Sequence, residues 1–349
     1  MALFHQRGEA LVNVTRVNEL RARLERTFPV HIAQAQRVFN VLARHVMLAR
    51  AQPSFDENSH VLVTGRTGTG KSFLAAEVAG WFELPFVAVD ATALTEAGYE
   101  GMSIGEVYAQ LYRAADGDVD RARHGVVLID EFDKLAFKND RKDDVSCTGV
   151  QYSLLKSLDG HSFPLPQEGE LAFPSRARGQ RGPSRILSTR GILFIAVGAF
   201  SGLVGPVTHA SIVRHGFFPE LIARFPNLVH LRSLGTRELR QYLSGTEVYL
   251  QEYVALFRAH GRELRFTPRA LDKLAVKAAR YDFGVRALKI VLDDLMVGHL
   301  DVLYGSTIPS FAVDVSGDAF TLRADAPCRG EGPPRRSTGR RGANGRKRP

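Results

Sequence analysis

The apolar positions along the chain follow two kinds of pattern. Short apolar runs are separated by longer stretches, for example residues 71–81 and 104–115, whose apolar positions have helical spacing. Short apolar strands that alternate with helices indicate an α/β fold, in which helices cover both faces of a parallel sheet. The five expected strands are residues 60–64, 86–90, 125–130, 191–197 and 228–231.

A different pattern begins after Ser233 and is helical. Thr267 and Pro268 supply an N-cap and a first-turn proline for one helix. Apolar residues from Leu271 follow i, i+3, i+4, i+7 spacing, and a second helix repeats it from Leu288. We expect a smaller, mainly helical C-terminal domain, closed by a strand or two near SFAVDV (310–315) and AFTLR (319–323). The predicted division is a helical segment at 1–58, a large α/β domain at 59–234, the small domain at 235–325 and a tail at 326–349.

Composition is that of an ordinary globular protein. Of the 349 residues, 44% are hydrophobic and 24% are charged. No apolar run reaches the roughly 18 residues of a membrane helix, and the first residues lack the apolar core of a secretory signal. The two cysteines, Cys147 and Cys328, lie far apart and indicate neither a disulfide framework nor a zinc finger. We therefore expect a cytoplasmic protein that makes no membrane contact.

The net charge of +9 is concentrated at the C-terminal end. Residues 326–349 carry eight Arg or Lys and one Glu, with five glycines and four prolines, which predicts disorder. Four more arginines lie at 176–185, inside a long polar loop that is expected at 160–190. Both segments are compatible with binding to nucleic acid or an acidic partner, and also with a solvated surface.

The strongest local motif is GRTGTGKS, which follows an expected strand and opens an expected helix. It fits the P-loop pattern of Gly, four residues, Gly, Lys and Ser or Thr. Gly68 and Gly70 let the backbone curl so that successive N–H groups face phosphate oxygens. Lys71 adds a charge at the β- and γ-phosphates, and the Ser72 hydroxyl coordinates Mg²⁺. The predicted ATP-binding residues are Gly65, Arg66, Thr67, Gly68, Thr69, Gly70, Lys71 and Ser72.

Two acids follow the third expected strand, in the motif VVLIDE. Asp130 and Glu131 are thereby delivered to the carboxyl edge of the sheet, where ligands bind in open α/β folds. We expect Asp130 to hold the magnesium ion and Glu131 to orient and deprotonate the attacking water. Since hydrolysis needs both a metal ligand and a base, these acids and the P-loop together predict a Mg²⁺-dependent ATPase.

Two arginines would complete such a site. Arg224 lies just before the last expected strand, and Arg286 lies at the start of a helix expected from residue 284. A positive charge beside a developing phosphoryl transition state can raise the rate by roughly 10³ to 10⁵. Spacing alone leaves open whether either arginine reaches the nucleotide.

These motifs resemble the ClpX family of AAA+ protein unfoldases. The resemblance is carried by LPFVAVDATALTEAGYEG, RHGVVLIDEFDKLA, DVSCTGVQYSLLKSLDG and GFFPELIARFP, and it continues to YDFGVRALK. It spans residues 28–305 with the motifs in family order, and the related HslU is the next nearest match.

The resemblance implies a ring of six identical subunits with ATP at each subunit interface. Arg224 then matches the arginine finger supplied to a neighbour's ATP, and Arg286 matches the sensor-2 arginine that contacts ATP in its own subunit. A tyrosine between glycines would present a large face that pushes on any polypeptide. The residues matched to the substrate pore are Tyr99, Gly98, Gly101 and, in a second pore loop, Val145.

The chain also departs from the family pattern. Compared with the family pattern, we expect neither the N-terminal zinc-binding domain with four cysteines nor the insertion after GAF that docks the ClpP peptidase. Arg66 replaces the family's proline, and Glu100 replaces an apolar residue. At 29–32, PVHI replaces the Gln-containing motif that helps to enclose adenine.

The combined prediction is a ClpX-like AAA+ ATPase that uses ATP and Mg²⁺. As a homohexamer without ClpP, it would unfold, translocate or remodel protein substrates through its pore. Two alternatives stay open. One is an AAA+ ATPase that acts on nucleic acid through its basic tail, and the other is a nucleotide-gated assembly protein with little turnover.

Overall fold

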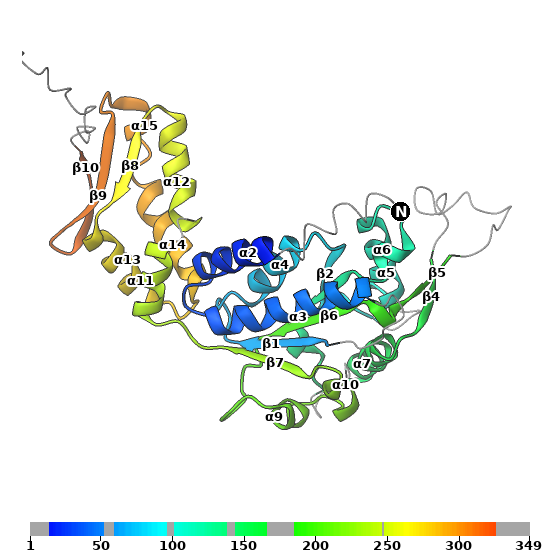
Figure 1. Ribbon diagram of the computed structural model, residues 1–349. Helices are drawn as coiled ribbons and strands as arrows, with labels where there is room; N and C mark the ends of the chain where they lie inside the picture. Colours follow the sequence, from blue (N-terminus) through cyan, green and yellow to red (C-terminus); the bar gives the residue numbers. More distant parts are fainter. Residues whose placement is uncertain are drawn as a thin grey trace, which may run out of the picture.

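The computed structural model describes residues 14–51, 59–95, 101–137, 144–165, 185–245 and 248–325. Figure 1 shows an α/β part built on a parallel sheet, and a C-terminal part of helices and a small sheet that projects from it.

A five-stranded sheet forms the centre of the α/β part. Its strands lie in the order β2-β3-β6-β1-β7, and every neighbouring pair is parallel. Val61 of β1 lies opposite Ile195 on one side and Asn227 on the other. The strands are β1 (Val61–Gly65), β2 (Phe86–Asp90), β3 (Val126–Asp130), β6 (Leu193–Gly198) and β7 (Asn227–Leu231). All five expected strands are thus confirmed.

Alternate residues of each strand enter two different cores, which is why the strands are apolar throughout. Val61 and Val63 belong to a core formed with α2, α3 and α4. Leu62 belongs to the opposite core, formed with α5, α7 and α10. The helices are α2 (Val14–Thr27), α3 (Ile32–Ala51), α4 (Lys71–Trp81), α5 (Ile104–Ala114), α7 (Asp144–Leu158) and α10 (Pro219–Ala223). Both faces of the sheet are therefore covered, as a parallel sheet requires.

The C-terminal part has a core of its own, made by helices that pack on a three-stranded sheet of order β10-β9-β8. The predicted cap is confirmed, because the Thr267 hydroxyl accepts a hydrogen bond from the Ala270 N–H and Pro268 opens the helix. β9 and β10 were expected from the sequence, whereas β8 was not. The elements are α11 (Thr236–Gly245), α12 (Val248–Ala259), β8 (Glu263–Phe266), α13 (Pro268–Ala279), α14 (Val285–Val297), α15 (Val302–Gly305), β9 (Ser310–Ser316) and β10 (Ala319–Ala324).

The segment expected to be one long loop begins and ends in a small antiparallel ribbon, so that expectation was wrong at its two ends. β4 (Ser162–Pro164) pairs with β5 (Ile186–Ser188), and Phe163 lies opposite the fully buried Leu187. These apolar side chains hold the ribbon against the sheet. The remaining short elements are η1 (Ala91–Ala93), α6 (Val119–Ala122), η2 (Phe132–Leu135), η3 (Thr189–Gly191) and α9 (His209–Arg214).

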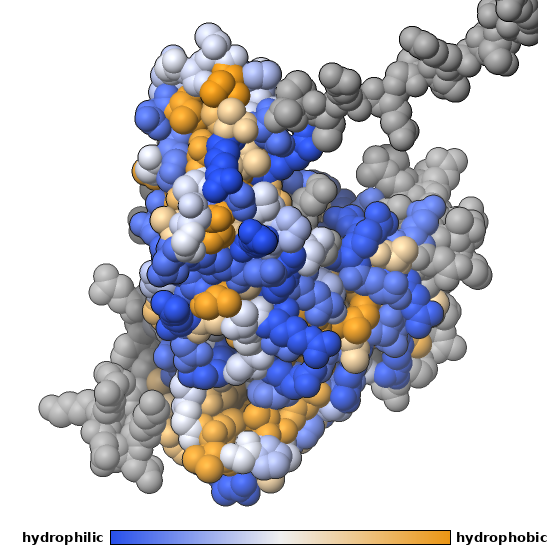
Figure 2. Space-filling model, turned by 90° about the vertical axis from the view of Figure 1, so that its left-hand side faces the viewer, coloured by the Kyte–Doolittle hydropathy of each residue, from blue (hydrophilic) through white to orange (hydrophobic). Residues whose placement is uncertain are grey.

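The surface is polar with a few apolar exceptions. Figure 2 shows a largely hydrophilic face, with an apolar patch toward its lower end. Val204, in the loop before α9, is 95% exposed. Apolar patches on an otherwise polar surface are typical of contact surfaces. Among the described residues, every helix falls short of the length and apolar character needed to cross a bilayer.

Candidate functional site

The P-loop connects β1 to α4 at the carboxyl edge of the sheet. Gly68 and Gly70 have φ angles of 77° and 89°, in the left-handed region that favours glycine. Gly70 is the N-cap of α4, and no side chain caps the helix there. The first N–H groups of α4 are therefore available to an anion. A cavity of about 350 Å³ is lined by Thr67, Gly68, Gly70, Lys71 and Ser72 of this loop.

The remaining loop residues shape the turn. The hydroxyl of the buried Thr69 donates to the Arg66 carbonyl at 2.8 Å. At Gly65 an added Cβ would lie 2.5 Å from the Leu231 carbonyl oxygen, so only glycine fits between β1 and β7 here.

The Lys71 ammonium is held inside the loop. Its Nζ donates to the carbonyl oxygens of Gly65 at 2.7 Å and Arg66 at 3.0 Å. Burial lowers the pKa of Lys71, and the charges of Asp130 and Asp133 oppose that shift. The lysine ammonium thus lies near these two acids, at the wall of the cavity.

The two predicted acids lie on the same cavity wall. The Ser72 hydroxyl donates to Asp130 Oδ2 at 2.6 Å, and the Glu131 N–H donates to Asp130 Oδ1 at 2.8 Å. Glu131 has a φ of 51°, which is uncommon for a residue other than glycine and typical of functional sites. Its side chain is exposed where the strand ends.

The pair of Ser72 and Asp130 fits a magnesium ion. A hydroxyl and a carboxylate oxygen lie 2.6 Å apart on the cavity wall, and both are hard oxygen ligands. Magnesium at nucleotide sites is usually held by one or two protein oxygens together with phosphates and water. No cluster of three or more His, Cys, Asp or Glu in the described ranges could hold a metal by itself. A cation here would therefore depend on the phosphates of its ligand.

The C-terminal part closes over the P-loop through the start of α14. The Val285 N–H donates to the Gly68 carbonyl oxygen at 2.9 Å. A Cβ at Gly284 would lie 2.3 Å from the same oxygen, so the approach depends on glycine. Arg66 forms a 2.5 Å ion pair with Asp282. A backbone hydrogen bond and an ion pair thus join the two parts of the molecule at the phosphate loop, where the glycine allows a close approach.

The two predicted arginines are placed differently. Arg286, in the first turn of α14, lines the phosphate cavity. Arg224, at the end of α10, forms a 2.6 Å ion pair with Asp159, and both side chains are about half exposed. Arg224 does not line the cavity of its own chain.

The segment predicted to grip substrate is described only at its ends. Tyr99 and Gly98 lie outside the described residues. At the ends, the Thr95 N–H donates to the Met102 carbonyl at 3.0 Å. Gly101 has a φ of 140°, and an added Cβ would lie 2.4 Å from a side-chain carbon of Thr95. The two ends of this segment are therefore held together.

Val145, assigned to a second pore loop, lies in the first turn of α7 instead. The helix continues because Val150, Leu154 and Leu158 recur at four-residue spacing and are buried against the sheet.

The motifs did not reveal a second cavity, of about 220 Å³, beside the phosphate cavity. Its lining residues include Phe28, Phe73 and Tyr249, which come from separate elements, so no sequence spacing indicates them. The sequence pointed to this cavity only through the segment at 29–32, which was predicted to replace the family motif that helps to enclose adenine.

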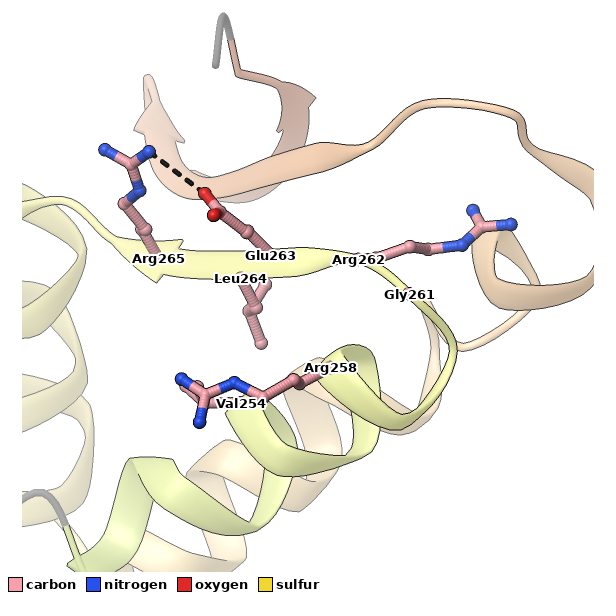
Figure 3. Close-up of a pocket in the computed structure, with 7 residues that line it drawn as sticks. All are labelled: Val254, Arg258, Gly261, Arg262, Glu263, Leu264 and Arg265. Carbon is pink, nitrogen blue, oxygen red and sulfur yellow. Dashed lines mark hydrogen bonds and ion pairs between the residues drawn. The ribbon is translucent and has the colours of Figure 1, made fainter. Parts of the chain in front are cut away.

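A further pocket lies in the C-terminal part, between α12 and β8 (Figure 3). Leu264 points toward Arg258 of α12, whereas Glu263 and Arg265 point the other way and form a 3.2 Å ion pair. Arg262 turns away and donates to backbone carbonyls beside α15. None of the P-loop residues lines this pocket, so it is separate from the phosphate site.

Comparison with known proteins agrees with this geometry. Residues 61–197 match the family model described as "ATPase family associated with various cellular activities (AAA)". This range begins at β1 and ends in β6, and so includes the P-loop and both acids.

The most similar relatives include three proteins named ClpX. The "ATP-dependent Clp protease ATP-binding subunit ClpX" of Porphyromonas gingivalis is 34% identical over 287 residues, which cover 73% of this chain and 67% of the relative. The Bacteroides fragilis protein of the same name is 34% identical, covering 73% and 66%. "ClpX 3" of Methylococcus capsulatus is 34% identical over 275 residues, covering 68% and 62%. The chain thus spans about two thirds of the length of the curated relatives it matches.

Proposed function

Since the chain belongs to the ClpX family of AAA ATPases, we propose that it couples ATP hydrolysis to the unfolding, translocation or remodelling of protein substrates in a homohexameric ring. The observation that carries the proposal is one cavity at which Lys71, Ser72, Asp130, Glu131 and Arg286 meet. This set contains a phosphate-binding cation, two metal-binding oxygens, a base and a second cation, as phosphoryl transfer to water requires.

Each residue of the cavity has a separate role in the proposed hydrolysis. Lys71 would exchange its loop carbonyls for phosphate oxygens, and Ser72 with Asp130 would hold the metal ion. Magnesium, when bound, neutralises charge on the phosphates. Glu131 takes the proton of the attacking water. Arg286 enters from the C-terminal part and stabilises the developing negative charge.

Arg224 is proposed to serve a neighbouring subunit. It is half exposed and does not line its own chain's cavity, which favours action on the nucleotide of another copy. The ion pair with Asp159 keeps its guanidinium in place until a neighbour is present. The apolar patch in Figure 2 also favours assembly.

The proposed ring works without ClpP. From Phe200 to Phe217 the chain is described throughout and forms a short loop and the six-residue helix α9. The shortness of this connection supports the proposal.

ATP hydrolysis in the presence of an unfolded model protein tests the proposal. We expect the polypeptide to stimulate hydrolysis by the wild type, and Tyr99→Ala to abolish both the stimulation and the unfolding of a folded substrate. Basal hydrolysis should survive, because Tyr99 is separate in sequence from the P-loop and its acids.

Tyr304→Ala is the matched control, since Tyr304 is 83% exposed in the C-terminal part and should be dispensable. Brisk hydrolysis that ignores both polypeptide and Tyr99 would refute the protein-remodelling function.

A further inference from the structure

The second cavity adjoins the phosphate cavity. Gly70, Phe73, Tyr249 and Val285 line both of them. A ligand whose phosphates lie over the P-loop therefore has about 220 Å³ of adjoining space for its remaining part.

The lining of this second cavity suits a flat conjugated ring. Phe73 is 46% exposed, although it is a large apolar residue, and its ring centroid lies 5.6 Å from that of Phe28. Tyr242 of α11 and Tyr249 of α12 face it from the C-terminal part. Aromatic faces of this kind stack on nucleobases without regard to which base it is. Stacking alone therefore gives affinity and little selectivity.

One polar ring in the lining has unused hydrogen-bonding capacity. His31, in the turn between α2 and α3, is 2% exposed and lines the cavity. Neither its Nδ1 nor its Nε2 has a hydrogen-bond partner in the part of the chain that the structure describes. A buried polar group without a partner is costly, and such groups usually meet water, an ion or a ligand.

The charge state of His31 suits a neutral ligand edge. Burial is the main reason that its pKa is lowered to about 4, and the nearby charge of Arg232 lowers it further against the opposing Glu238. The ring is therefore neutral near pH 7, and offers one N–H donor and one nitrogen acceptor. Nucleobases present both kinds of group on their edges, whereas phosphates present only acceptors.

We propose that His31 hydrogen-bonds to the base of the bound nucleotide and helps to determine which base the site accepts. The inference rests on the nucleotide site of the proposed function. The turn that carries His31 is fixed from the C-terminal part, because Gln241 donates to the Pro29 carbonyl at 3.0 Å. The histidine is thus held in place before a ligand arrives.

Calorimetry with ADP, GDP and pyrophosphate tests this role. His31→Phe keeps a flat ring and removes the hydrogen bond. We expect it to weaken ADP binding by about 3- to 10-fold, with pyrophosphate unchanged within about 2-fold. The ratio of ADP to GDP affinity should move toward one, and His31→Gln, which keeps a donor and an acceptor, should bind ADP nearly as the wild type does.

His260→Phe is the matched control, because His260 is exposed in the C-terminal part and should change none of these affinities. A second readout uses the unmutated side chain. Ring nitrogen resonances of His31, assigned with either variant, should shift on addition of ADP but not of pyrophosphate.

If His31→Phe loses ADP affinity and pyrophosphate affinity equally, His31 acts only on the structure of the site, and the inference is overturned. Unchanged ADP affinity would overturn it as well. Wild-type protein that binds pyrophosphate but not ADP would leave the phosphate site standing and refute the base contact. Failure to bind either ligand would instead refute the proposed nucleotide site, and the inference with it.

Discussion

Glu131 is the carboxylate with the most freedom to act at the phosphate cavity. Asp130 accepts from Ser72, and Asp133 accepts from the Ala199 N–H at 2.9 Å. Glu131 has no side-chain hydrogen bond within the described ranges and is exposed on the cavity wall. The base that activates water should therefore be this residue.

Replacing Glu131 by glutamine removes the base and keeps the shape. We expect steady-state phosphate release to fall by about 10² to 10⁴. ADP binding, measured by calorimetry, should stay within about 3-fold, because the phosphate contacts come from other residues. Full turnover by Glu131→Gln would exclude the assigned role.

Gly284 is a second position at which a small change, the addition of a Cβ atom, is expected to disturb the site. Its φ of 55° and ψ of −135° lie outside the regions that other residues occupy, and a Cβ there would meet the Gly68 carbonyl oxygen at 2.3 Å. Gly284→Ala should push the start of α14 off the P-loop, and with it Arg286.

We expect Gly284→Ala to lower both nucleotide affinity and turnover by at least about 10-fold, since misplacing a catalytic group by 1 Å can cost about 100-fold. Gly80→Ala in α4 is the control, because its Cβ position is open and the helix favours alanine. Normal activity of Gly284→Ala would show that the contact between the two parts is dispensable.

At the scale of elements, Gln151 of α7 joins segments that are far apart in sequence. Its fully buried amide donates to the Leu135 carbonyl at 2.7 Å and the Gly216 carbonyl at 3.1 Å, and it accepts from the Phe218 N–H at 3.0 Å. One side chain thus ties α7 to η2, which follows the two acids, and to the turn before α10, which carries Arg224.

Gln151→Ala would remove the amide partner of the Leu135 carbonyl and of the Phe218 N–H, whereas the Gly216 carbonyl keeps its hydrogen bond from the Phe137 N–H. Each unpaired group costs about 1–3 kcal/mol, so we expect the free energy of unfolding to fall by roughly 2 kcal/mol or more. Gln241→Ala, which removes a single exposed hydrogen bond, should cost less than about 1 kcal/mol. Urea unfolding measures the free energy of unfolding of both variants. Equal values would refute the proposed role of Gln151 in joining α7 to η2 and to the turn before α10.

Sequence reasoning worked where one segment carries the whole signal. The strands were predictable because each is an uninterrupted apolar run, and the P-loop because its glycines, lysine and serine are contiguous. Lys71, Asp130 and Arg286 could each be predicted from a local motif. That they line one cavity depends on the tertiary structure, which the local motifs do not show. The aromatic cavity with Phe73 and Tyr249 was not predictable, because its walls come from several elements. Strand β8 was missed because it is only four residues long and half of it is charged.

At the scale of the whole molecule, buried neutral histidines make stability depend on pH. Burial is the main cause that lowers the pKa of His31 and His124 to about 4 and of His60 to about 3. A histidine in the unfolded chain has a pKa of about 6.5. Below that pH the unfolded chain therefore binds protons that the buried histidines of the folded chain do not bind. This stability is fully present above about pH 6.5 and is lost as the pH falls toward the folded values.

For the fully buried His60 the loss approaches about 1.4 kcal/mol per pH unit within that window. We expect the thermal midpoint of the protein to be level between pH 7.5 and 7 and to fall steeply from pH 6 to pH 5. A midpoint that stays constant down to pH 5 would contradict the buried, neutral state of these rings.

The position of β1 in the sheet has a consequence for synthesis on the ribosome. Its two neighbours are β6 and β7, and Val61 must wait for Asn227 to be made before its second edge is covered. At about 5–20 residues per second, that wait is on the order of 10–30 s. Throughout that interval the nascent chain exposes an apolar strand with an open edge, which is a hazard for aggregation. A protein proposed to unfold others would thus be, while it is being made, a client for chaperones itself.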